Sequence, residues 1–144
     1  MTKRIVCGVD NSPTAAAAAR RAAELAVALG ADLHLVSAYG KIESELVEIG
    51  SEKLLLSNEM EADRIAGAVA VELRQEFPGL DVTPSSSEGR AGEALVKTAE
   101  HLGADLIVVG NKRVQGIARV LGSIARDVAQ HAPCDVFVVH TVAR

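Results

Sequence analysis

Aromatic residues are nearly missing from this chain of 144 residues, which has no tryptophan, one tyrosine and two phenylalanines. Proteins that bind RNA or single strands commonly stack the bases on aromatic side chains, so such a site is not expected here. An excess of basic residues is missing too, because 15 lysines and arginines stand against 19 aspartates and glutamates, for a formal net charge of −4. Nucleic-acid binding normally needs a basic surface. Both shortages argue against nucleic acid as a partner.

Long apolar runs and paired cysteines are scarce as well. No stretch approaches the ~20 apolar residues of a membrane-spanning helix. The apolar run near the N-terminus, about five residues long, is too short for the core of a secretory signal. Cys7 and Cys134 lie within or beside apolar runs and predict reduced, buried or half-buried thiols, with Asp135 opposing a thiolate at Cys134. We therefore expect one cytoplasmic domain over residues 1–144, without a membrane partner.

Catalytic and metal-binding signatures are also lacking. The sequence has no G-x-S-x-G elbow and no Walker lysine followed by Ser or Thr. None of the four histidines has a metal-ligand spacing to another histidine or to a cysteine. Asp10 has no acidic neighbour, whereas a receiver domain needs a cluster of acids after its first strand. No catalytic residue and no metal ligand is predicted.

Aliphatic residues, by contrast, are abundant, and hydrophobic residues make up 49% of the chain. Five short apolar runs show no polar alternation, which is typical of strands buried on both faces of a parallel sheet. These runs are Ile5–Val9, Leu33–Ala38, Leu80–Thr83, Leu106–Val109 and Val136–Val139. Pro84 directly after the third run favours an edge position for that strand.

Helical patterns fill the four gaps between these runs. The first begins at Ser12-Pro13 and ends at Gly30, the second extends from about Ser57 to Phe77, and the third from Ala91 to Leu102. The fourth places Val120, Leu121, Ile124, Ala125 and Val128 on one face and ends before Pro133. Strands that alternate with helices in this way predict a doubly wound parallel sheet.

Ligands of an open parallel sheet bind beyond the carboxyl ends of the strands, where the strand order reverses. Asp10 follows the first strand, where it either caps the next helix together with Ser12 or accepts a hydrogen bond from a ribose hydroxyl or a metal-bound water. The loop from Gly110 to Ser123 follows the fourth strand, and such a loop can hold a phosphate on backbone N–H groups. Arg113 stands in this loop where a second close glycine is expected.

Taken together, these segments resemble the universal stress protein family over essentially the whole chain. The likeness rests on Val9-Asp10, on GADLIVVG at 103–110, on the glycine loop that follows, and on PCDVFVV at 133–139. It implies a five-stranded open parallel α/β fold of the adenine-nucleotide α-hydrolase type, with sheet order 3-2-1-4-5 and helices on both faces. It also implies a homodimer in which the last strand, Val136–His140, pairs with its copy.

The family's nucleotide-binding members carry a glycine, two residues, a glycine, nine residues, then glycine and Ser or Thr. Gly110 matches the first glycine and Gly122-Ser123 the last pair, whereas Arg113 replaces the second glycine and the loop is one residue shorter. The resemblance places Asp10 at the ribose and Ala38 at the adenine, and Gly89 resembles the family's glycine before the third helix. The implied nucleotide-binding residues are Val9, Asp10, Ala38, Val109, Gly110, Asn111, Arg113, Gly116, Gly122, Ser123 and Ile124.

The resemblance therefore implies a stress-response protein that binds an adenine nucleotide (ATP, AMP or cyclic AMP), with or without Mg²⁺ and without efficient turnover. Arg113 leaves a second interpretation open, in which a dimeric family member binds no nucleotide and acts through protein contacts. A third interpretation is a slow ATP hydrolase that uses Asp10 and a divalent cation, although no positioned base is visible.

Overall fold

The computed structural model describes residues 3–40, 48–111 and 121–140, with only the helix backbone described for 48–57. The chain alternates strands and helices: β1 (Lys3–Gly8), α1 (Pro13–Leu29), β2 (Ala31–Tyr39), α2 (Glu48–Glu76), β3 (Val82–Glu88), α3 (Ala91–Leu102), β4 (Leu106–Asn111), α4 (Ser123–His131) and β5 (Asp135–His140). All strand pairs are parallel, and their order is β3-β2-β1-β4-β5. The doubly wound sheet predicted from the sequence is thus confirmed.

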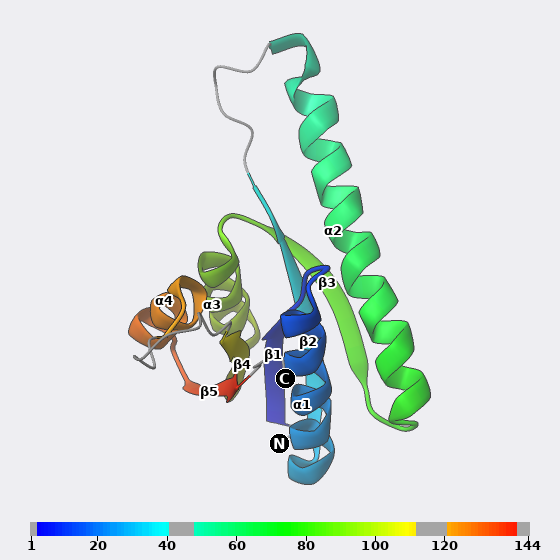
Figure 1. The fold of residues 1–144 in the computed structure, drawn as a ribbon, viewed down its shortest axis with the longest axis vertical. Coiled ribbons are helices and arrows are strands. Elements are labelled where there is room, and N and C mark those ends of the chain that lie inside the picture. The colour runs from blue at the N-terminus through cyan, green and yellow to red at the C-terminus, as the bar shows by residue number, and fades with distance from the viewer. Residues whose placement is uncertain (1–2, 41–47, 112–120, 141–144) are drawn as a thin grey trace.

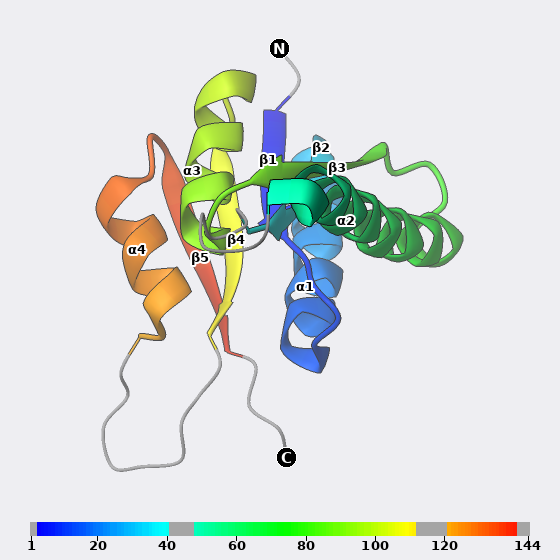
Figure 2. The same cartoon turned by 90° about the horizontal axis from the view of Figure 1, so that it is seen from above.

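Helices cover both faces of the sheet, with α1 and α2 on one face and α3 and α4 on the other (Figure 1, Figure 2). Neighbouring residues of β1 enter different cores: Ile5 and Cys7 pack toward α1 and α2, while Val6 packs toward α3 and α4. All three are at most 1% exposed. The uninterrupted apolar run of β1 therefore reflects burial on both faces, as in other parallel sheets.

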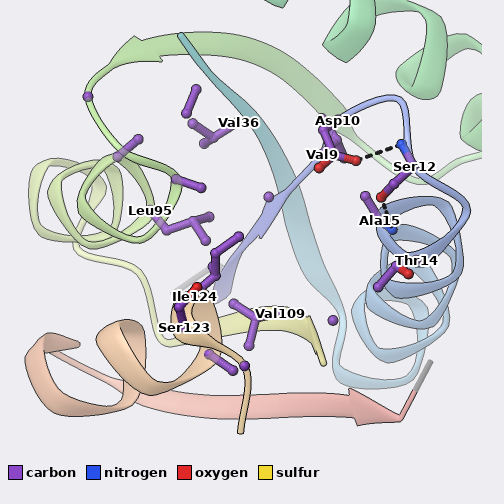
Figure 3. A pocket seen from close by; sticks show the side chains of 18 residues that line it. Val9, Asp10, Ser12, Thr14, Ala15, Val36, Leu95, Val109, Ser123 and Ile124 are labelled. Carbon is purple, nitrogen blue, oxygen red and sulfur yellow. Dashed lines mark hydrogen bonds between the residues drawn. The ribbon is translucent and has the colours of Figure 1, made fainter. Parts of the chain in front are cut away.

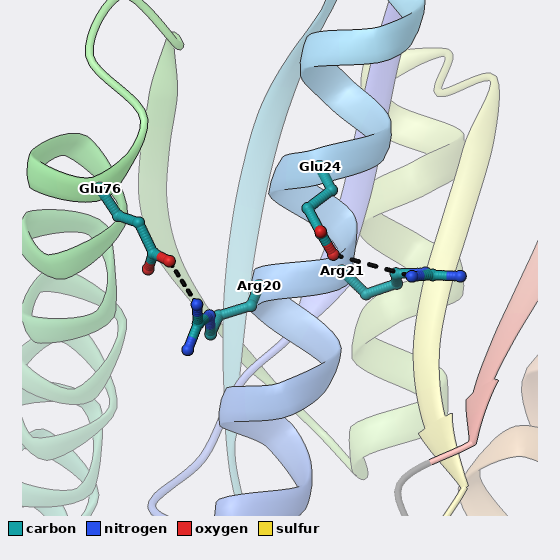
Figure 4. Close-up of polar contacts among 4 residues, drawn as sticks. All are labelled: Arg20, Arg21, Glu24 and Glu76. Carbon is teal, nitrogen blue, oxygen red and sulfur yellow. Dashed lines mark hydrogen bonds and ion pairs between the residues drawn. The ribbon is translucent and has the colours of Figure 1, made fainter.

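The first helix has the caps that its sequence predicts. The Oγ of Ser12 accepts a hydrogen bond from the N–H of Ala15 at 3.1 Å, and Gly30 ends the helix with φ 65°. Its buried face is made only of alanines, which let the helix lie close to the sheet: Ala18, Ala19, Ala22, Ala23 and Ala26. On the exposed side, an ion pair between Arg20 and Glu76 joins α1 to α2 (Figure 4).

Two elements extend further than expected. Helix α2 begins at Glu48 and not near Ser57, because the residues before Ser57 include strong helix formers such as Leu, Glu and Lys. Its first part reaches beyond the edge of the sheet (Figure 1). Strand β3 continues through Pro84 to Glu88, which a strand at the sheet edge can tolerate because one side needs no ladder hydrogen bonds.

The fourth helix is shorter than its apolar pattern suggests. Because α4 begins at Ser123, Leu121 precedes the helix, and both Leu121 and Ile124 are exposed. Only Ala125 and Val128 of the predicted face are buried, and Val120 lies outside the described residues. Leu121 and Ile124 therefore do not belong to a buried helix face. Among the described helices, none is both long and apolar enough to cross a membrane.

Candidate functional site

A cavity of about 580 Å³ opens at the carboxyl edge of the sheet (Figure 3). It lies where β1 has β2 on one side and β4 on the other, which is the point at which the strand order reverses. Its lining combines three strand ends with the first turns of α1, α3 and α4: Gly8, Val9, Asp10, Ser12, Thr14, Ala15, Val36, Ala38, Gly89, Ala91, Ala94, Leu95, Val109, Gly110, Gly122, Ser123, Ile124 and Ala125. A volume of this size suits a small organic ligand.

Most of the cavity wall is apolar. Val36 and Leu95 form one side, while Asp10, Ser12 and Thr14 lie on the side of α1 (Figure 3). A Cβ atom on Gly8 would lie 3.1 Å from Cδ1 of Leu95, so the glycine gives this leucine room. A flat apolar group can therefore pack against one side of the cavity, and a polar group can bind at the other.

The joint between β1 and α1 presents a carboxylate to the cavity. The Oδ1 of Asp10 accepts a hydrogen bond from the N–H of Ser12 at 2.7 Å, and the Ser12 hydroxyl caps α1. Capping thus falls to Ser12, whereas Asp10 forms a local turn before the helix. Because a carboxylate offers about four acceptor positions, Asp10 keeps capacity to accept hydrogen bonds from hydroxyl groups of a ligand.

The joint between β4 and α4 presents backbone donors. Gly122 is the N-cap of α4 and provides no side-chain cap, and the first turn contains no acidic residue. Ser123, Ile124 and Ala125 occupy that turn and line the cavity. The first N–H groups of a helix have no partner within the helix and carry the positive end of its dipole. This end of the cavity can therefore hold an anion.

The start of α3 differs, because acidic side chains lie against it. Glu93 of its first turn folds back so that its Oε1 lies close to the position that a Cβ atom on Gly89 would take, and Gly89 has φ 127°. Asp127 of α4 packs in the same way against Gly92. Two carboxylates thus face the positive end of α3, and the start of α4 is the better anion site of the two.

Thiols and imidazoles lie away from the cavity lining. Burial raises the pKa of the Cys7 thiol to about 12. Burial, then Asp135 and Asp105, raise the pKa of half-buried Cys134, in the direction that the sequence predicts. Burial and the neighbouring Arg4 lower the pKa of His34. Within the described residues, no group of three or more His, Cys, Asp or Glu side chains could hold a metal ion.

The cavity brings together most residues that the family resemblance implies. Eight of them line it: Val9, Asp10, Ala38, Val109, Gly110, Gly122, Ser123 and Ile124. Asn111 does not line the cavity but accepts a hydrogen bond from Gly122, and Arg113 and Gly116 lie outside the described residues. Sequence reasoning did not assign Thr14, Ala15, Ala91, Ala94 or Leu95 to the site, although each lies in or near the first turn of a helix at this edge.

The structure is thus a parallel α/β fold with a cavity at the point where the strand order reverses. The model of the universal stress protein family matches residues 1–140. Relatives from Staphylococcus haemolyticus and Mycobacterium tuberculosis that carry this family name are each 32% identical, over 96% of this chain and 85% and 97% of their own lengths. A solved universal stress protein in complex with cAMP superposes with TM-score 0.72 at 30% identity, covering 97% of this chain and 98% of the other. The chain belongs to the universal stress protein family.

Proposed function

We propose that this universal stress protein binds an adenine nucleotide in the cavity and acts in the cytoplasm without efficient turnover of its ligand. The observation that carries the proposal is the start of α4, where the N-cap is a glycine without a side-chain cap. It opens on an apolar cavity that has a carboxylate at another side. The related structure in complex with cAMP supports it, because cAMP combines the three groups for which the cavity has partners.

In this proposal each part of the nucleotide meets a matching surface. The adenine ring lies against Val36, Ala38 and Leu95, where its faces are removed from water. The ribose hydroxyls donate to Asp10, and the phosphate accepts from the backbone N–H groups at Ser123 and Ile124.

The cavity lining supports the proposal of weak turnover. Asp10 is the one ionisable side chain among the described residues that line the cavity, and one of its oxygens already accepts from Ser12. A hydrolase would need a base to activate water. The slow-hydrolase alternative, with Asp10 and Mg²⁺, predicts phosphate release from ATP that stops when Asp10 is changed to Ala.

Titration calorimetry tests the proposal and the role of Arg113 together. Adenosine, AMP, cyclic AMP, ADP and ATP are titrated into the wild type and into Arg113→Ala. Binding of AMP or cyclic AMP at least as tight as that of ATP is expected, and the variant should lose affinity for every phosphorylated ligand while adenosine binds unchanged. Tighter ATP binding by the variant would make Arg113 an obstruction. A wild type that binds none of the five would support the interpretation without nucleotide.

The proposed assembly is a homodimer through β5. This strand lies at the sheet edge, its residues Val136 to Val139 are half-buried, and one side of its backbone has no strand beside it among the described residues. Pairing with a second β5 would cover that edge. Val138→Lys should give monomers or insoluble protein in size-exclusion chromatography with light scattering. A wild type that stays monomeric at high concentration would contradict the dimer.

A further inference from the structure

Asn111 ends β4 and is one of the two polar side chains that are buried among the described residues, the other being Ser37. Its Oδ1 accepts a hydrogen bond from the backbone N–H of Gly122 at 2.7 Å. The carbonyl oxygen of Gly122 in turn accepts from the N–H of Arg126 within α4. The strand therefore engages one backbone group of Gly122 and the helix engages the other.

The residue type at position 122 matters for this arrangement. A Cβ atom on Gly122 would lie 3.3 Å from Oδ1 of Asn111, which is tighter than an ordinary contact. Moreover, a Ser or Asp at an N-cap accepts from the second or third N–H of its own helix. In α4 these N–H groups belong to Ile124 and Ala125, which both line the cavity. Glycine has no side chain to cap them, and among the described residues Asn111 links the start of α4 to the end of β4 in its place.

We infer that Asn111 is a positioning residue for the phosphate of the bound nucleotide. Its amide oxygen fixes the start of α4 against the end of β4, so that the open N–H groups at Ser123, Ile124 and Ala125 point into the cavity. This role differs from the direct contact that the family resemblance implies for Asn111, because the side chain does not line the cavity. The inference rests on the proposed function.

Calorimetry with AMP and adenosine separates positioning from general support of the fold. Asn111→Ala should weaken AMP binding roughly tenfold because the hydrogen bond from the Gly122 N–H is lost, while adenosine binding stays within about twofold. Asn111→Asp keeps the acceptor but adds a negative charge near the phosphate, so its loss of AMP affinity should shrink as salt rises. In Asn111→Ala the loss should not depend on salt. Ser37→Ala, which removes the other buried polar side chain, is the matched control and should bind AMP as the wild type does.

Hydrogen exchange of the Gly122 amide in the ligand-free protein directly reports its hydrogen bond to Asn111. The amide should be protected in the wild type and in Asn111→Asp, and should exchange faster in Asn111→Ala. Equal losses of AMP and adenosine affinity in Asn111→Ala would overturn the inference, as would unchanged AMP affinity alongside faster exchange; both results leave the proposed function standing. A wild type that binds neither ligand would overturn the proposed function and this role with it.

Discussion

The joint between β1 and α1 and the joint between β4 and α4 reach the same cavity but satisfy their backbone groups differently. In the first joint the hydrogen bonds are local, since Asp10 accepts a hydrogen bond from the N–H of Ser12 and the Ser12 hydroxyl caps the helix. In the second joint the hydrogen bond is accepted by Asn111 at the end of the strand, and among the described residues no side chain caps the first turn of α4. The first joint therefore presents an acceptor, and the second presents donors.

This difference bears on ligand selection. A ligand that satisfies both joints needs hydroxyl donors at one joint and an anion at the other, together with an apolar group that covers Val36 and Leu95. A nucleoside phosphate has these three parts. An uncharged nucleoside satisfies only the first joint, so phosphorylated and unphosphorylated ligands report on the joints separately.

The largest expected effect is at Gly110, where the two joints touch. A Cβ atom there would lie 3.1 Å from Cγ2 and 3.3 Å from the backbone oxygen of Thr14 in α1. Gly110→Val should therefore lower the free energy of unfolding by about 3 kcal/mol, measured by urea denaturation. Gly67→Ala is the control: it lies inside α2 with open space around it and should raise stability by about 1 kcal/mol. Unchanged stability of Gly110→Val would show that the joints do not depend on this contact.

The next effect concerns the acceptor of the first joint. Asp10→Ala should weaken binding of adenine nucleotides by about 1.5–3 kcal/mol in calorimetry, because charge-assisted hydrogen bonds to the ribose are lost. Asp10→Asn keeps an oxygen that can accept from the N–H of Ser12 but removes the charge, and should lose less affinity. Equal affinity of Asp10→Ala and the wild type would reject the ribose role. A large fall in its melting temperature without ligand would instead assign Asp10 to the local turn.

Much of the fold could be predicted from the sequence, because its signals are local. Ser12-Pro13 and Gly30 mark both ends of α1, and the apolar run after Lys3 and Arg4 marks β1 through burial on both faces. The strand order came from the family resemblance and is confirmed. The sequence pattern predicts the start of α2 near Ser57, later than the observed Glu48, although strong helix formers precede Ser57.

The candidate site was less accessible to sequence reasoning, because it depends on contacts between distant residues. The tie from Asn111 to Gly122 spans the loop that carries the glycine motif, and no sequence pattern shows which backbone group an asparagine will reach. Leu95 lines the cavity next to Gly8 of another element, where a Cβ atom would crowd it. The sequence pattern predicts too early a start for α4, because Leu121 and Ile124 continue the helical apolar pattern although both are exposed.

A smaller effect separates the two joints by their caps. Ser12→Ala removes the hydroxyl that accepts from Ala15 and should lower the free energy of unfolding by about 1 kcal/mol. Ser123→Ala is the matched change at the second joint, where the hydroxyl caps no helix, and thermal unfolding without ligand should hardly differ from the wild type. If both changes destabilise the protein equally, a serine hydroxyl stabilises each helix start, and the proposed difference between the two joints is wrong.

The smallest expected effect lies outside both joints, at His34 in β2. Burial, and then the Arg4 guanidinium, lower the pKa of this imidazole below its usual 6.5, with Asp32 and Asp81 opposing them. Below pH 6.5 the unfolded chain therefore binds a proton at His34 more readily than the folded chain does. The free energy of unfolding falls for this reason as the pH falls, and above pH 6.5 His34 no longer lowers it. His34→Gln should reduce the drop in melting temperature between pH 7.5 and pH 5.5. Because His34 does not line the cavity, the variant should bind AMP and adenosine at pH 7.5 as the wild type does.

If the melting temperature drops equally in both proteins, groups other than His34 cause the acid sensitivity. If the variant binds AMP differently from the wild type, a change in β2 away from the cavity affects the two joints.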